Sequence, residues 1–259
     1  MFWSYENNQS EINYFFNKNH IFIILISLVI IVFFSMYISR QRLGVQRGFV
    51  FVSTLILLAL ELLRIFWNYK YLEFNGEAIN FVSVTNLDFF TLTLWISIPI
   101  LLLSSITIGK NGRTFGLSFV FSITTLFGII SLIYPLGLNS NFEFYQFINL
   151  DFILIRSLII MLGFTVVLSQ WISVGKFLDY YRCLISLVLC GIICLVVCLI
   201  LRDNTNLFYI SYCPIFEALG LSMSFPYHYI IMGLFIFLFQ ILLYLPFQIY
   251  TSKHQYIED

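Results

Sequence analysis

Charged residues are scarce in this sequence. Only 10% of its 259 residues are Asp, Glu, Lys or Arg, whereas soluble domains carry about 25%. Hydrophobic residues make up 60%, and the mean hydropathy is +0.94. A soluble globular domain is therefore excluded, and the basic residues are too few to predict a nucleic-acid partner.

Several motifs of known chemistry are also absent. The sequence contains no glycine-rich phosphate-binding loop and no HExxH zinc-peptidase signature, so nucleotide-driven and zinc-dependent chemistry have no support. It has no linker rich in Pro, Gly or Ser, no low-complexity tract and no detectable internal repeat. We therefore expect one domain over residues 1–259 and no cofactor, and a solute transporter built from repeats is disfavoured.

The five cysteines do not predict a metal site. Cys190, Cys194 and Cys198 recur every four residues on one face of an apolar segment, but no His or carboxylate shares that face. Thiolate metal sites need a closed, convergent set of ligands, whereas a free Cys packs as a small hydrophobic residue. Helix packing therefore explains this pattern better than a metal site or a disulfide framework.

Apolar sequence is abundant. A transmembrane helix needs roughly 20 consecutive apolar residues, and seven segments reach this length without the alternating pattern of a β-barrel strand. The predicted spans are residues 21–39, 48–67, 88–108, 114–134, 151–171, 181–201 and 227–247. The expected fold class is therefore all-α, a polytopic membrane protein with a seven-transmembrane-helix bundle.

Basic residues alternate between the predicted loops. Most Lys and Arg residues follow the first, third and fifth spans. The loops on the other side hold only Lys18, Lys70 and Arg202. Because basic loops stay on the cytoplasmic side, we predict that the N-terminus is outside the cell membrane and that the C-terminus is cytoplasmic. An odd number of spans places the two termini on opposite sides as well.

The polar residues of the predicted spans gather at their outer ends. They are Glu61 and Arg64 in the second span, Asp88, Thr91 and Thr93 in the third, Asp151 and Arg156 in the fifth, Asn206 after the sixth and His228 at the start of the seventh. Ionisable residues within a membrane usually face the bundle interior or a water-filled cavity. We therefore predict a polar pocket that opens to the outer leaflet and is lined by the second, third, fifth and seventh spans.

Some of these residues also fit roles without a ligand. Asp88, Asp151 and His228 lie near predicted helix starts, where Asp is a favoured N-cap. Glu61 and Arg64 are one turn apart and also fit a structural ion pair. The fifth-span Arg is harder to explain in this way. It lies about 8 Å further along the helix than the fifth-span Asp, and we expect it to need a neighbouring carboxylate.

Short stretches spread over most of the chain resemble one membrane-protein family. They are KNHIFIIL at residues 18–25, ELLRIFW at 61–67, YPLGLN at 134–139, NTNLFYI at 204–210, FPYHY at 225–229 and YLPF at 244–247. Their order is similar to that of the YwaF-type bacterial integral membrane proteins, which are related to eukaryotic transmembrane acyltransferases and androgen-induced fatty-ester hydrolases. The resemblance implies a multi-pass protein of a bacterial cell membrane that binds lipid or acts on it.

The resemblance also assigns roles to particular positions. Family members carry Leu-Pro-Leu-His-Leu-Cys at the start of the third span, where FFTLTL places Thr91 at the His position and Thr93 at the Cys position. The hydrolase relatives use a Thr in place of that Cys, so Thr93 is the candidate nucleophile, with His228 or Asp88 as its base. The family's fifth-span His corresponds to Arg156, which cannot act as a base because its guanidinium stays protonated.

The polar residues and the resemblance together support two functional hypotheses. In the first, the protein is a lipid acyltransferase or fatty-ester hydrolase, in which Thr93 attacks and Arg156 stabilises an oxyanion or binds a phosphate. In the second, it retains the polar pocket without the full catalytic set and binds lipid or another amphiphile. The second is preferred because Thr91 and Arg156 replace two family histidines. Membrane lipids are the expected partners, and a homo-oligomer or a role as a partner subunit in the membrane stays open.

Overall fold

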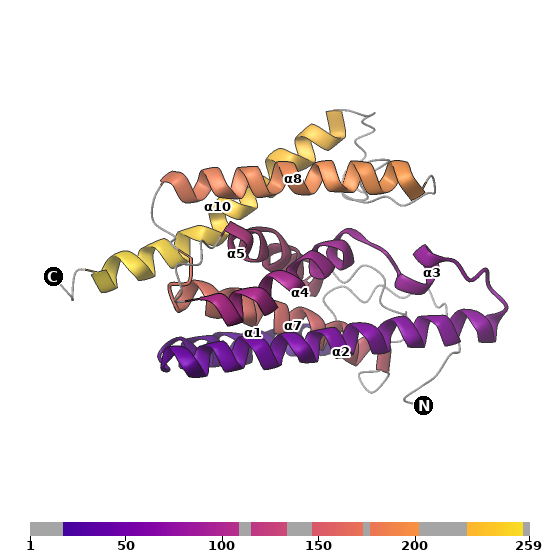
Figure 1. The fold of residues 1–259 in the computed structure, drawn as a ribbon, viewed down its shortest axis with the longest axis horizontal. Coiled ribbons are helices and arrows are strands. Elements are labelled where there is room, and N and C mark those ends of the chain that lie inside the picture. The colour runs from indigo at the N-terminus through magenta and orange to yellow at the C-terminus, as the bar shows by residue number, and fades with distance from the viewer. Residues whose placement is uncertain (1–17, 109–114, 134–146, 173–176, 202–226, 256–259) are drawn as a thin grey trace.

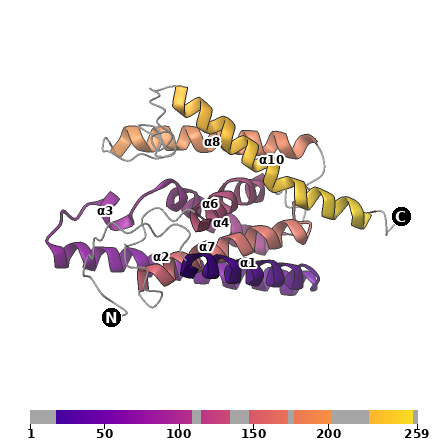
Figure 2. The same cartoon turned by 180° about the vertical axis from the view of Figure 1, so that it is seen from behind.

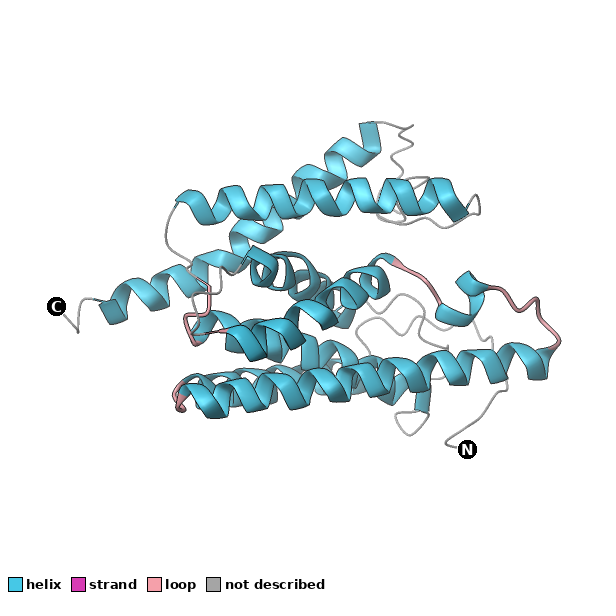
Figure 3. Cartoon of the chain, viewed as in Figure 1, coloured by secondary structure: helices cyan, strands magenta, loops and turns pink. Residues whose placement is uncertain are grey.

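The computed structural model describes residues 18–108, 115–133, 147–172, 177–201 and 227–255. All regular elements in these ranges are helices, and no strand occurs in them (Figure 3). In chain order they are α1 (Lys18–Ser39), α2 (Leu43–Asn75), α3 (Phe81–Thr85), α4 (Phe89–Thr107), α5 (Phe115–Phe119), the π-helix η1 (Val120–Thr125), α6 (Leu126–Ile133), α7 (Phe147–Leu168), α8 (Phe177–Leu201) and α10 (Tyr227–Gln255). The predicted all-α class is therefore confirmed for the described residues.

Six helical segments are long and apolar enough to cross a membrane, which indicates a multi-pass membrane protein. These segments are Ile21–Ser39, Leu43–Asn75, Phe89–Thr107, Gly116–Ile133, Phe147–Leu168 and Tyr180–Leu201. Each overlaps one of the first six predicted spans. The seventh predicted span, 227–247, lies in α10, whose described apolar part is the shorter segment Gly233–Ile249. Six of the seven predicted spans are thus helices long and apolar enough to cross a membrane, and the count of seven spans stays a prediction.

The helices pack in three layers, which Figures 1 and 2 show from opposite sides. One layer contains α1, α2 and α7, the middle layer contains α4 and the continuous run α5–η1–α6, and the third contains α8 and the first part of α10. The later part of α10 crosses toward α7, where the rings of Phe247 and Phe164 are in contact. Burial is greatest for Gly116–Ile133, where 72% of the apolar window is buried, and for Phe147–Leu168, where 67% is, and it is least for Ile21–Ser39, at 22%. The outer helices therefore leave apolar side chains exposed, as contact with lipid tails requires.

Successive long helices run in alternating directions along the long axis of the molecule (Figure 1). Helix α2 runs toward the end that carries α3, and α4 runs back from that end. The last turns of α2, the short α3 and the first turns of α4 and α7 consequently lie together. Most of the polar residues singled out in the sequence belong to these turns.

Helix α2 is longer than the sequence predicted. We expected a span of 48–67 followed by a loop, whereas α2 continues to Asn75. It ends at Gly76, whose φ of +67° is a left-handed conformation that glycine adopts without strain. The side chain of Asn68 donates to the carbonyl of Val84 at 3.0 Å, so the additional turns hold α3 in place. Polar residues ended the apolar run here, but they did not end the helix.

Helix α7 is held closely between α1 and η1. A Cβ atom placed at Gly163 would lie 2.9 Å from the Cβ of Thr125, closer than real Cβ contacts come, so the approach of α7 to η1 requires glycine. On another face of α7, the hydroxyl of Ser35 donates to the carbonyl of Met161 at 3.1 Å. These contacts fix the position of α7 and hence of the ionisable side chains in its first turns.

Candidate ligand-binding site

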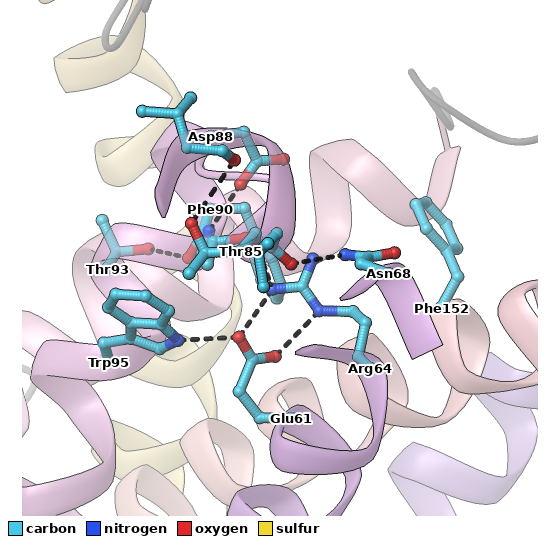
Figure 4. Close-up of polar contacts among 12 residues, drawn as sticks. Glu61, Arg64, Asn68, Thr85, Asp88, Phe90, Thr93, Trp95 and Phe152 are labelled. Atoms are coloured by element: carbon cyan, nitrogen blue, oxygen red, sulfur yellow. Dashed lines mark hydrogen bonds and ion pairs between the residues drawn. The ribbon is translucent and has the colours of Figure 1, made fainter. Parts of the chain in front are cut away.

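Glu61 lies at the centre of a buried polar network between α2 and α4 (Figure 4). It is 2% exposed, and its carboxylate accepts hydrogen bonds from Arg64, one turn later on α2, at 2.6 and 3.1 Å. The indole N–H of Trp95 on α4 donates to the same carboxylate at 2.7 Å. The ion pair that the spacing of Glu61 and Arg64 allowed is therefore present, and it has bidentate geometry.

Arg64 connects α2 to α3 and α4. Besides pairing with Glu61, its guanidinium donates to the carbonyl of Thr85 at 3.1 Å and to the hydroxyl of Thr91 at 3.3 Å. The part played by Trp95 has a signal in the sequence, because Trp95 lies four residues after Thr91 on the same helix face. The contact with Thr85 has no signal in the sequence, because Thr85 offers a backbone carbonyl that any residue would supply.

Asp88 is the N-cap of α4 and is exposed. Its backbone is extended, with φ of −115° and ψ of 178°, and its side chain accepts a hydrogen bond from the backbone N–H of Thr91 at 2.6 Å. This is the geometry by which an Asp satisfies a free N–H in the first turn of a helix. Asp88 was considered both as a pocket residue and as a helix cap, and the structure shows it as the helix cap.

Arg156 lies in α7 and is only 8% exposed. Its Nε donates to the hydroxyl of Ser131 at 2.9 Å, and its Nη1 donates to the carbonyl of Phe152 at 3.2 Å. The central guanidinium carbon lies 3.2 Å from the centre of the Phe152 ring and 4.6 Å from that of the Phe90 ring.

The surroundings of Arg156 differ from the expected carboxylate neighbour. Among the described residues no carboxylate forms an ion pair with it. Aromatic faces, a hydroxyl and a carbonyl surround the guanidinium instead, and cation–π contacts of this kind are favourable when the cation is shielded from water. In the described part of the chain its positive charge thus has no acidic side chain in contact with it, and the nearby carboxylates act on it only at longer range.

Asp151 lies in the second turn of α7 and is 1% exposed. Neither of its carboxylate oxygens has a hydrogen-bond partner in the described part of the chain. A cap role is excluded for it, because α7 begins four residues earlier, at Phe147. Asp151 is close enough to Glu61, Arg64 and Arg156 to interact with them electrostatically.

Glu61, Arg64, Asp151 and Arg156 thus form one group, which we call the charged cluster. Three of them are buried, and the side chain of Arg64 is 12% exposed. Two are acidic and two are basic, and the exposed Asp88 is also close enough to Arg64 and Arg156 to interact with them electrostatically. Glu61 and Arg64 are paired with each other, whereas Asp151 and Arg156 are near each other without pairing. The charged cluster therefore carries one negative and one positive charge that its own side chains do not neutralise by contact.

Thr93 lies apart from the charged cluster. Its side chain is fully buried, and its hydroxyl donates to the carbonyl of Phe90 in its own helix at 2.9 Å (Figure 4). Its carbonyl accepts a hydrogen bond from Thr124 of η1 at 3.3 Å. The side chain of His228 and the whole of Asn206 lie outside the described residues. The pairing of Thr93 with His228 consequently stays a prediction.

An apolar groove lies toward the other end of the bundle, between α1, α7 and α10. It has a volume of about 420 Å³ and is lined by Val32, Met36, Phe164, Leu168, Leu242, Leu243, Pro246 and Phe247. No charged or polar side chain lines it, so it is not the polar pocket that the sequence predicted.

Comparisons of this chain with protein families, with curated proteins and with solved structures found no match. The resemblance to YwaF-type membrane proteins therefore stays a prediction. The interpretation of the charged cluster rests on its own geometry.

Proposed function

We propose that this protein binds the polar headgroup of a lipid, or of another amphiphile, at the charged cluster. The observation that supports this proposal is the buried carboxylate of Asp151, which has no hydrogen-bond partner among the described residues, beside the buried guanidinium of Arg156, which forms no ion pair with any of them. A polar headgroup carries the donors and acceptors that these two side chains lack.

The energetic cost of the charged cluster also supports a role beyond folding. A charged residue costs about 2.5–3.5 kcal/mol at the centre of a membrane helix. Well-packed apolar side chains are often as stabilising as a buried ion pair, and a buried charge without a partner is more costly still. Stability alone would therefore favour apolar residues at Asp151 and Arg156.

The proposed ligand comes from the outer leaflet of the cell membrane. This part of the proposal requires seven spans, with α10 as the seventh, and an N-terminus outside the cell. Helix α10 has 29 residues and is about 44 Å long, enough to cross a membrane. With the N-terminus outside, the turns that carry the charged cluster face the outer leaflet, and the connection between α1 and α2, which contains Arg40 and Arg42, is cytoplasmic.

The alternative function, acyl transfer or ester hydrolysis through Thr93, has less support. A threonine hydroxyl is a weak nucleophile until a neighbouring base activates it. The hydroxyl of Thr93 donates to a backbone carbonyl, and no side chain in the described part of the chain forms a hydrogen bond with it. We therefore treat Thr93 as a buried helix residue in designing the test below.

Native mass spectrometry of the protein purified with co-extracted lipid tests the proposal. We expect bound lipid on the unaltered protein and on the Thr93→Ala variant, and at least a tenfold lower bound fraction on Arg156→Leu. Size-exclusion chromatography and thermal unfolding show whether each variant is folded. A folded Arg156→Leu variant that retains its lipid would contradict the proposal. Release of acyl chains by the unaltered protein but not by Thr93→Ala would instead support the enzyme.

A further inference from the structure

Asp151 and Arg156 present opposite charges on one helix that do not meet. They are five positions apart, whereas side chains that face each other on a helix are three or four apart. Arg156 is turned toward Ser131, Phe90 and Phe152, and neither oxygen of Asp151 has a hydrogen-bond partner in the described part of the chain. The helix thus holds a separated pair of charges in a buried site.

The other cation of the charged cluster is not available to Asp151 either. Arg64 makes two hydrogen bonds to Glu61 and one each to Thr85 and Thr91. Turning it toward Asp151 would leave Glu61 buried with only the donor from Trp95. Whichever acidic residue Arg64 contacts, one carboxylate is left without a cation in contact with it among the described residues, and a cationic ligand would supply that contact.

We infer that the charged cluster binds a zwitterionic headgroup with a primary ammonium, the ammonium at Asp151 and the anionic group at Arg156. This inference rests on the proposed function and names the class of ligand. A primary ammonium has three N–H donors and one positive charge, so it satisfies both oxygens of Asp151. A quaternary ammonium supplies the charge without donors, and a glycerol headgroup supplies hydroxyl donors without the charge. The expected order of affinity is therefore ethanolamine first, with choline and glycerol headgroups below it.

The test is a titration of the delipidated protein with three phospholipids that share their acyl chains and carry ethanolamine, choline or glycerol headgroups. Binding is measured by native mass spectrometry in detergent. We expect the ethanolamine lipid to bind about tenfold more tightly than the other two, as a charge-assisted hydrogen bond would give. In Asp151→Asn this preference is lost, while binding of the glycerol lipid persists and shows that the variant is folded.

Glu73→Gln is the matched control. Glu73 lies on an exposed part of α2 near the same end of the bundle, and its substitution removes one negative charge, as Asp151→Asn does. We expect this variant to retain the preference for ethanolamine. Equal binding of the three lipids to the unaltered protein, or a preference that survives Asp151→Asn, would overturn the inference and leave the proposed function intact. Failure of all three lipids to bind the unaltered protein would overturn the proposed function as well.

A further experiment distinguishes a lipid ligand from a soluble zwitterion with the same headgroup. Phosphoethanolamine, which has the headgroup without acyl chains, is added as a competitor to the complex with the ethanolamine lipid. We expect no displacement at equal concentration, because the acyl chains contribute to binding in the membrane. Displacement at equal concentration would overturn the assignment to a lipid.

Discussion

Glu61 and Asp151 are both buried acidic residues of the charged cluster, but their surroundings differ. Glu61 accepts hydrogen bonds from Arg64 and Trp95, which compensate its charge and join α2 to α4. Asp151 accepts none in the described part of the chain. Glu61 therefore joins two helices, whereas Asp151 is the residue to which the proposed function assigns a ligand.

Removal of Glu61 is predicted to be strongly destabilising. The Glu61→Leu variant leaves Arg64, whose side chain is 12% exposed, without its carboxylate, and it leaves the indole N–H of Trp95 without an acceptor. Breaking a buried ion pair in this way costs about 3–5 kcal/mol in the free energy of unfolding. Thermal unfolding in detergent micelles measures the loss as a lower midpoint temperature.

The double variant Glu61→Leu/Arg64→Met is the control for this prediction. It removes both charges together and leaves no isolated cation, so we expect it to be more stable than Glu61→Leu alone. If the double variant is as unstable as Glu61→Leu, or less stable, the isolated charge of Arg64 is not the cause of the destabilisation.

At the scale of elements, α7 has two functions along its length. Its central part packs against η1 and α1 through Gly163 and Met161, and its first turns carry Asp151 and Arg156. Because the helix is continuous, its packing in the centre sets the position of both ionisable side chains. A substitution in the centre of α7 should therefore lower the stability of the protein. It should change the charged cluster only indirectly, by moving the first turns of α7.

Gly163→Ala is predicted to destabilise the protein by about 1–3 kcal/mol, the usual cost of adding a methyl group to a packed core. The added Cβ would meet Thr125, a buried β-branched residue whose own Cβ cannot rotate away. Thermal unfolding in detergent is again the measurement. Gly233→Ala in α10 is the matched control, because no atom lies within 4 Å of its added Cβ. Similar midpoint temperatures for Gly163→Ala and the unaltered protein would contradict the close approach of α7 to η1.

At the scale of the whole molecule, the alternating direction of the helices gathers polar turns at one end of a bundle whose outer surface is apolar (Figure 1). The position of the charged cluster in the membrane then depends on the orientation of the whole chain. The connection between α1 and α2 and the residues that follow α2 must lie on opposite sides of the membrane if α2 crosses it.

Accessibility of single cysteines tests this orientation. Arg42→Cys lies just before α2 and Glu77→Cys just after it, and both positions are exposed. A membrane-impermeant thiol reagent applied to intact cells is expected to label Glu77→Cys, whereas Arg42→Cys reacts only after permeabilisation. The protein without either substitution controls for its native cysteines. The reverse pattern would contradict an outer N-terminus, and labelling of both in intact cells would contradict α2 as a span.

Parts of the site could be predicted from the sequence because they depend on neighbours along the chain. The spacing of Glu61 and Arg64 on one turn of α2 predicted their ion pair, and Asp88 before an apolar run had the position of a helix cap. The surroundings of Arg156 could not be predicted, because Phe90 and Ser131 belong to other helices. A carboxylate partner was expected there, and aromatic rings took its place.

The amino-acid sequence alone predicted the helices of the described residues and their suitability for a membrane, because the length and apolar composition of a segment decide whether it can satisfy its own backbone in lipid. It also placed the buried charges near one end of the bundle. Which of these charges are paired became clear only in the folded molecule, since contacts between helices depend on rotation and packing that no local pattern records. That is why Glu61 and Asp151, both predicted as site residues, differ in the structure: Glu61 accepts hydrogen bonds from its neighbours, and Asp151 accepts none from the described residues.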